Sequence, residues 1–178
     1  MDYLSIIKKY YKEGTKLYDI YMLHAESVAD KAVELAQKHP ELNLDVSFVR
    51  EAAMLHDIGI FMTDAPEIDC FGDKPYICHG YLGSELLQRE GFPKHALVCE
   101  RHTGTGIGMK TIIENKLPIP HRDMRPQTIE EQLVCFADKF FSKTKPHKEK
   151  TPEKVREKIK KSKKGSVKKF DKWCEMFL

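Results

Sequence analysis

The sequence has no long uninterrupted apolar segment, and it is poor in features that mark secreted or membrane proteins. No apolar run approaches the roughly 20 residues that a membrane-spanning helix requires. The N-terminal MDYLSIIKKYYKEG has neither a continuous apolar stretch nor the small-residue cleavage site of a signal peptide. The five cysteines are odd in number and form no CxxC pair. We therefore expect a cytoplasmic protein with reduced thiols and no membrane partner, rather than a disulfide framework or a zinc finger.

Internal repeats and Gly/Ser-rich linkers are also absent, and alternating strand patterns are nearly so. Instead, apolar residues recur with the 3.6-residue period of helices, and 178 residues is the length of a single domain. The sequence predicts an all-α fold, a helical bundle of about five core helices. These helices are expected over residues 17–38, 45–59, 75–90, 93–102 and 128–141, with a short helical turn at 110–115.

Charge is distributed unevenly along the chain. Residues 142–178 contain 14 Lys/Arg and 5 Asp/Glu, a net charge of +9, whereas residues 1–141 contain 16 and 22, a net charge of −6. We predict a main domain over residues 1–141 and a basic helical tail over residues 142–178. Thr151-Pro152-Glu153 has the composition of a helix start, and Phe170, Trp173, Cys174 and Phe177 lie at helical spacing, so the tail is expected to pack on the main domain. A solvated Lys-rich helix is the simpler interpretation of its charge; contact with nucleic acid or an acidic partner is the alternative.

Histidine and aspartate occur on the apolar faces of several predicted helices. Burying an imidazole or a carboxylate without a partner is unfavourable by several kcal/mol or more, so a set of them in one small core requires compensation. Two divalent cations would provide it. Other histidines (His39, His95 and His147) are expected to be ordinary core or surface residues. The predicted metal ligands are His24, His56, Asp57, His79, His102 and Asp138.

The ligand types restrict the metal. Imidazole and carboxylate without thiolate suit iron or manganese, with zinc, cobalt and nickel as alternatives, and disfavour calcium and magnesium. A carboxylate can bridge two ions roughly 3.5–4 Å apart, and Asp57 is the expected bridge. The remaining ligands divide into His24, His56 and Asp138 for one ion, and His79 and His102 for the other.

Four short motifs carry a resemblance to a known family. They are HDIG at 56–59, HGYLGSELL at 79–87, RHTGTG at 101–106 and CFADKF at 135–140. Over about residues 21–141 the chain resembles the HD superfamily of metal-dependent phosphohydrolases, and among characterised members it is most similar to the symmetrical dinucleoside-tetraphosphatases. It differs from them in the segment 104–126 and in Lys139-Phe140-Phe141 after the last ligand.

The resemblance implies hydrolysis of a small phosphate ester or anhydride derived from a nucleotide, by water rather than by a Ser or Cys nucleophile. Asp57, Arg101 and Lys139 are the expected catalytic residues, and the segment 103–127 is long enough to act as a lid. Two alternatives stay open: a di-iron oxygenase, and a metal-containing module for sensing or nucleic-acid binding. We expect a monomer or a homodimer. The predicted substrate contacts are Arg101, Thr103, His121, Arg122, Arg125 and Lys139.

Overall fold

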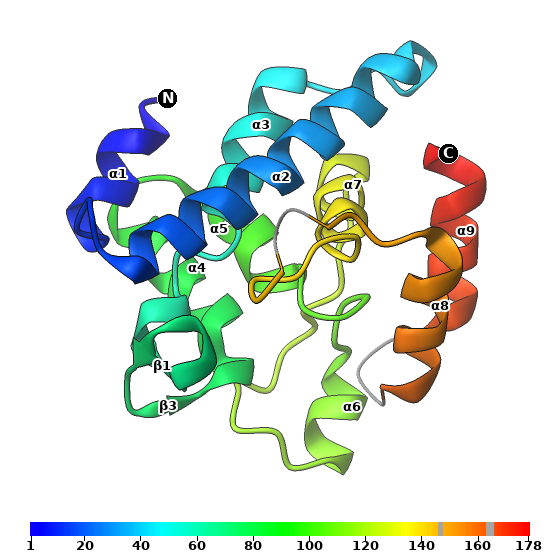
Figure 1. Cartoon of the computed structure of the whole chain (residues 1–178). Helices are drawn as coiled ribbons and strands as arrows, with labels where there is room; N and C mark the ends of the chain where they lie inside the picture. Colours follow the sequence, from blue (N-terminus) through cyan, green and yellow to red (C-terminus); the bar gives the residue numbers. More distant parts are fainter. Residues whose placement is uncertain (146–147, 163–165) are drawn as a thin grey trace.

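The computed structural model describes residues 1–145, 148–162 and 166–178; His147 lies outside them. The all-α prediction is confirmed, and α2, the longest helix described, crosses the molecule beside α3 and α7 (Figure 1). Within the described residues, none of the helices is long and apolar enough to cross a membrane. The helices are α1 (Tyr3–Tyr10), α2 (Lys16–Lys38), α3 (Val46–Leu55), α4 (His79–Arg89), α5 (Pro93–Arg101), α6 (Met109–Glu114), α7 (Ile129–Asp138), α8 (Pro152–Lys161) and α9 (Val167–Phe177).

Helix starts follow the local sequence. Thr15 caps α2 by accepting a hydrogen bond from the Tyr18 backbone N–H at 3.3 Å, and Thr128 caps α7 in the same way. The buried face of α2 carries small residues such as Ala25, Ala29 and Ala32, so that α3 can pack closely against it. His24 lies on this same face.

A small sheet is formed by the segment of the chain that connects α3 to α4. It comprises β1 (Thr63–Ala65), β2 (Cys70–Phe71) and β3 (Lys74–Pro75), with β2 antiparallel and β3 parallel to the central β1. The sequence did not predict this sheet, because strands of two or three residues are too short for alternation to be visible. It did not predict α1 either.

Glycines allow the turn after α3 to lie against α4. The sequence predicted a helix over residues 45–59, but α3 ends at Leu55, and Gly59 has an ordinary φ of −87°. A Cβ on Gly59 would lie 2.3 Å from the carbonyl oxygen of His79 and 2.5 Å from the backbone nitrogen of Gly83. The glycine is therefore required for close approach of two backbones, and it holds the HDIG turn against α4.

The segment between α5 and α7 is long but has a core of its own. Ile107 and Met124 form an isolated antiparallel bridge, with the Ile107 N–H donating to Met124 at 3.1 Å. Helix α6 lies within this loop, and Ile112 from it is completely buried. A small second core, which consists of Cys78, Ile107, Ile112, Ile119 and Met124, fastens the segment next to the start of α4.

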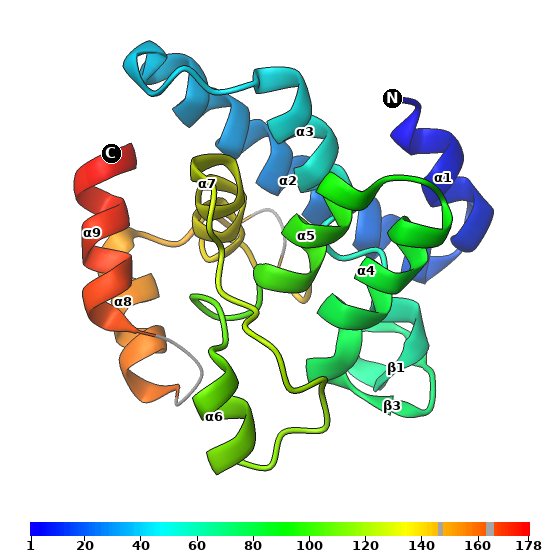
Figure 2. The ribbon, with the colours of Figure 1, turned by 180° about the vertical axis from the view of Figure 1, so that it is seen from behind.

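The C-terminal helices pack on the main core. Phe170 and Phe177 of α9 have ring centroids 5.4 and 5.5 Å from that of Phe136 on α7, and Trp173 Nε1 donates to Gln132 at 2.9 Å. Val155 of α8 belongs to the same buried cluster. Figure 2 shows α8 and α9 together along one side of the molecule, next to α7. The described part of the basic tail thus shares the core of the main domain.

Candidate metal centre

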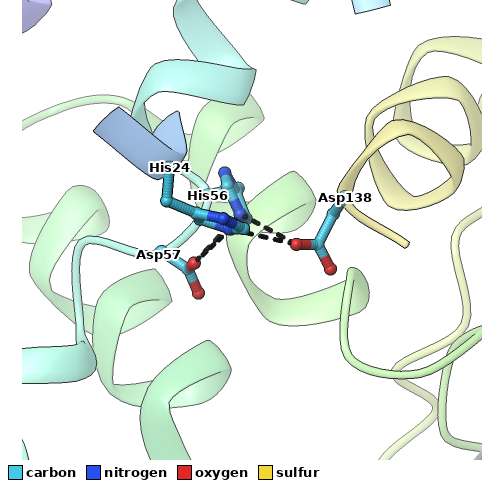
Figure 3. Close-up of side chains that lie close together, drawn as sticks. All are labelled: His24, His56, Asp57 and Asp138. Carbon is cyan, nitrogen blue, oxygen red and sulfur yellow. Dashed lines mark hydrogen bonds and ion pairs between the residues drawn. The ribbon is translucent and has the colours of Figure 1, made fainter. Parts of the chain in front are cut away.

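The structure brings all six predicted metal ligands together. They come from α2, the end of α3, the start of α4, the end of α5 and the end of α7, so the site lies where five segments meet. Their ligand atoms form two groups, and within each group all atoms lie within 4.8 Å of one another. The four-ligand group is His24, His56, Asp57 and Asp138 (Figure 3), and the three-ligand group is Asp57, His79 and His102.

Three of the histidines are oriented by the same hydrogen bond. In each, Nδ1 lies close to the backbone carbonyl oxygen three residues earlier, which accepts the Nδ1–H. The Nε2 atom then has no proton in the neutral ring and presents its lone pair to the cluster. The bonds join His56 to Ala53, His79 to Tyr76 and His102 to Cys99, each at 2.6 Å.

Asp57 lies between the two groups. Its Oδ2 is 3.2 Å from His24 Nε2 and 3.1 Å from His56 Nε2. Its Oδ1 is 3.5 Å from His79 Nε2 and 3.3 Å from His102 Nε2. Each carboxylate oxygen therefore faces a different group, as a bridging ligand requires. Asp138 completes the four-ligand group, with Oδ1 at 3.1 Å from His24 Nε2.

Burial and neighbouring charge set the protonation of these groups. Burial lowers the pKa of His79 to about 3 and also lowers the pKa of His102, so both rings are neutral at pH 7. For His56, burial opposes the charge, but the Asp57 and Asp138 carboxylates outweigh it and raise the pKa to about 9. Burial also favours protonation of Asp57, yet Lys143 and the adjacent imidazoles hold its pKa well below its usual range.

The donor set fits divalent cations. Within the cluster, His24 Nδ1, His56 Nε2 and Asp57 Oδ1 have no hydrogen-bond partner among the described residues. In the three-ligand group, His79 Nε2 and His102 Nε2 face each other at 3.0 Å. Two lone pairs that face each other with no proton between them, as on these two neutral rings, are stabilised by a cation. The cluster is therefore suited to bind metal through imidazole and carboxylate.

Two lysines lie against the carboxylates. Lys139 Nζ is 2.7 Å from Asp138 Oδ2, and Lys143 Nζ is 2.5 Å from Asp57 Oδ2. The Lys143 side chain is only 14% exposed. The sequence did not identify Lys143, which it placed in the basic tail. Only its position shortly after Asp138 could have suggested a role, because lysine is frequent throughout this part of the chain.

A cavity of about 430 Å³ opens beside the cluster. His24, His79 and Asp138 lie on its metal-ligand side, and Thr103 and Lys139, both predicted substrate contacts, also line it. Tyr76 stacks on the His79 ring with centroids 4.6 Å apart and forms part of the wall. The opposite wall comes from α8, which the sequence placed in the tail.

The other predicted substrate contacts do not line this cavity. Arg101 donates to both carboxylate oxygens of Glu131, at 2.8 and 3.0 Å, and so joins the end of α5 to the start of α7. Arg122 is paired with Glu100 and Arg125 with Asp123. His121 is exposed. These partners were not visible in the sequence, since Arg101 and Glu131 are 30 residues apart. A part for these four residues in substrate binding stays a prediction.

Comparison with known proteins identifies the class. The HD domain family matches residues 21–143, which include all six cluster residues, and the chain belongs to this family. No solved structure gives a significant match.

Among sequence relatives, an uncharacterised protein of Methanocaldococcus jannaschii is 37% identical over 80% of this chain and 75% of its own length. Two proteins named tRNA (cytidine(56)-2′-O)-methyltransferase, from Thermoplasma volcanium and Picrophilus torridus, are 33% and 34% identical over 74% and 70% of this chain. The chain spans only 34% and 32% of their length. These relatives are not dinucleoside-tetraphosphatases, so the expected similarity to that group is not supported.

Proposed function

We propose that this protein is a phosphohydrolase that uses two divalent cations, iron or manganese, to cleave a small phosphate ester or anhydride derived from a nucleotide. The observation that carries the proposal is the division of six buried ligands into two groups that share Asp57. Metal-binding HD domains generally act as hydrolases, and the matched residues include the whole cluster.

A pair of bound cations supplies Lewis acidity for a phosphoryl oxygen and a nucleophilic water at neutral pH. The chain supplies the rest. Asp57 and Asp138 orient the site, and Lys139 and Lys143 place positive charge at the cavity wall, where they can bind the equatorial oxygens of a phosphate. Thr103 can donate a hydrogen bond from its hydroxyl to the same group. The largely buried setting excludes much of the bulk water that would weaken these interactions.

The names of two relatives favour a substrate derived from a nucleotide, but they do not specify which nucleotide. Both are tRNA-modifying enzymes, and a region similar to this chain makes up about a third of each. Methyl transfer belongs to those whole proteins, and we do not propose it here. A phosphonate oxygenase would use a similar anionic substrate, so oxygen consumption must be measured beside hydrolysis.

The test starts from metal-depleted protein reloaded with manganese or iron. We expect release of phosphate or nucleotide from a panel of dinucleoside polyphosphates, mononucleotides, cyclic nucleotides and an aryl phosphate. Asp57→Asn should abolish turnover, whereas the control Asp30→Asn, which removes an exposed carboxylate paired with Arg50, should not. No hydrolysis of any probe by the loaded protein, or full activity in Asp57→Asn, would contradict the proposal.

A further inference from the structure

The C-terminal helix α8 forms one wall of the cavity beside the metal centre. Val155, Lys158 and Ile159 line that wall, and all three lie beyond residue 143, where the family match ends. Val155 and Ile159 are buried, and Lys158, three residues after Val155, lies on the same side of the helix. This wall therefore offers a molecule in the cavity one ammonium group, with apolar side chains beside it.

A second lysine, Lys150, does not line the cavity itself, but it interacts with Lys158 of the wall and has a buried ammonium without a partner among the described residues. The Nζ atom of Lys150 has no hydrogen-bond partner within residues 1–145, 148–162 and 166–178. The backbone of Lys150 is fixed, because its N–H donates to the carbonyl oxygen of Phe140 at 2.8 Å. An ammonium held in this way is unfavourable unless an anion offsets its charge.

The charges around Lys150 are mostly positive. Lys158, Lys139 and Lys143 repel its ammonium, and Asp138 is the acidic side chain that attracts it. All four of these residues line the cavity. Burial and Lys158 together lower the pKa of Lys150 to about 8. An anion in the cavity would reduce this repulsion between lysines.

We propose that Lys158 and Lys150 form an anion subsite that binds a second phosphate group of the substrate, while the scissile phosphate lies at the metal centre. This inference rests on the proposed hydrolase function and narrows its substrate to nucleotides with two separate phosphate groups. The four-carbon stem of Lys150 lets its ammonium turn toward such a group. Ile77, Phe141 and Tyr76 line the same cavity and offer apolar contact to the nucleoside between the two phosphates.

Two nucleotides that differ by one phosphate test this subsite. Binding of adenosine 3′,5′-bisphosphate and adenosine 5′-monophosphate to the manganese-loaded protein is measured by calorimetry. We expect the bisphosphate to bind about tenfold more tightly, because its second phosphate gains at least one charge-assisted hydrogen bond. Lys158→Gln and Lys150→Met should each remove most of this preference and leave the affinity for the monophosphate within about twofold.

Lys160→Gln is the matched control. Lys160 lies on the same helix as Lys158, carries the same charge and is exposed, but it lies two positions further along, on another side of the helix from Lys158. It should therefore keep the preference for the bisphosphate. The subsite is wrong if the wild-type protein does not distinguish the two nucleotides or binds neither. It is also wrong if Lys160→Gln lowers the preference as much as Lys158→Gln does.

The same measurements separate this inference from the proposed function. A preference that depends on Lys158 and Lys150, in a protein that hydrolyses neither these nucleotides nor the panel above, supports the subsite and contradicts the hydrolase. Hydrolysis without any preference for the bisphosphate supports the hydrolase and contradicts the subsite. Thermal unfolding adds a check on folding, since Lys150→Met should raise the melting temperature of the free protein at pH 7 and abolish the extra rise caused by the bisphosphate.

Discussion

Removing one ligand at a time should show that the metal centre consists of two groups with one shared member. Asp138 belongs only to the four-ligand group and His102 only to the three-ligand group, whereas Asp57 belongs to both. Asp138→Asn and His102→Gln should therefore each lose one ion per chain and keep the other. Asp57→Asn should lose both, because one oxygen of its carboxylate faces each group.

The effect on stability follows from the same division. A ligand that binds only the folded state at 100 times its Kd stabilises the protein by about 2.7 kcal/mol. Two ions at that saturation contribute about 5 kcal/mol to the wild type, each single-group variant keeps about half, and Asp57→Asn keeps almost none. For a chain of this length 1 kcal/mol corresponds to roughly 2–4 °C, so each ion should raise the melting temperature by about 5–10 °C.

The assay combines elemental analysis after gel filtration with calorimetry of each variant in its loaded and metal-free forms. Comparing a variant with its own metal-free form removes any change in intrinsic stability. His95→Gln is the control, because His95 contacts Glu51 outside the cluster, and it should retain both ions. Retention of one ion by Asp57→Asn, or loss of both ions in each single-group variant, would refute the arrangement.

Three further predictions concern residues around the site. Gly59→Ala should lower the free energy of unfolding by about 3 kcal/mol in urea denaturation, because its Cβ would overlap the His79 carbonyl; a change below about 1 kcal/mol would exclude that close contact. Arg101→Met should lower it by about 3–5 kcal/mol, because Glu131 is only 4% exposed; lost activity without lost stability would instead indicate that Arg101 serves mainly as a phosphate contact. The pKa of Lys150 is lowered from 10.5 to about 8 in the folded protein, so the unfolded chain binds more protons between these two pH values. The charge of Lys150 therefore destabilises the fold fully below about pH 8, and this destabilisation disappears as the pH rises to 10.5. Lys150→Met should consequently stabilise the protein by about 1–2 kcal/mol at pH 7, with a gain that disappears by pH 10.5, and urea denaturation at both pH values measures this.

Several features of the molecule could be predicted because they depend on local pattern and residue chemistry. The 3.6-residue period placed helix α2 within a residue of its observed ends, and Thr128 marked the start of α7. Histidine or aspartate on an apolar helix face, as at His24 and His56, is unfavourable without a shared partner. For this reason the sequence alone indicated which side chains converge.

Other features depend on which segments meet in space, and only the tertiary structure decided them. Lys143 contacts Asp57 across 86 positions of the chain, and Arg101 is neutralised by Glu131 on another helix. Gly59 is required by a backbone that packs against it, not by its own dihedral angles. Charge pairing, close approach and cavity walls arise between segments distant in the sequence, and no local period records them. The composition of this chain therefore determined its helices and the kind of site, whereas folding decided how the site is charged and enclosed.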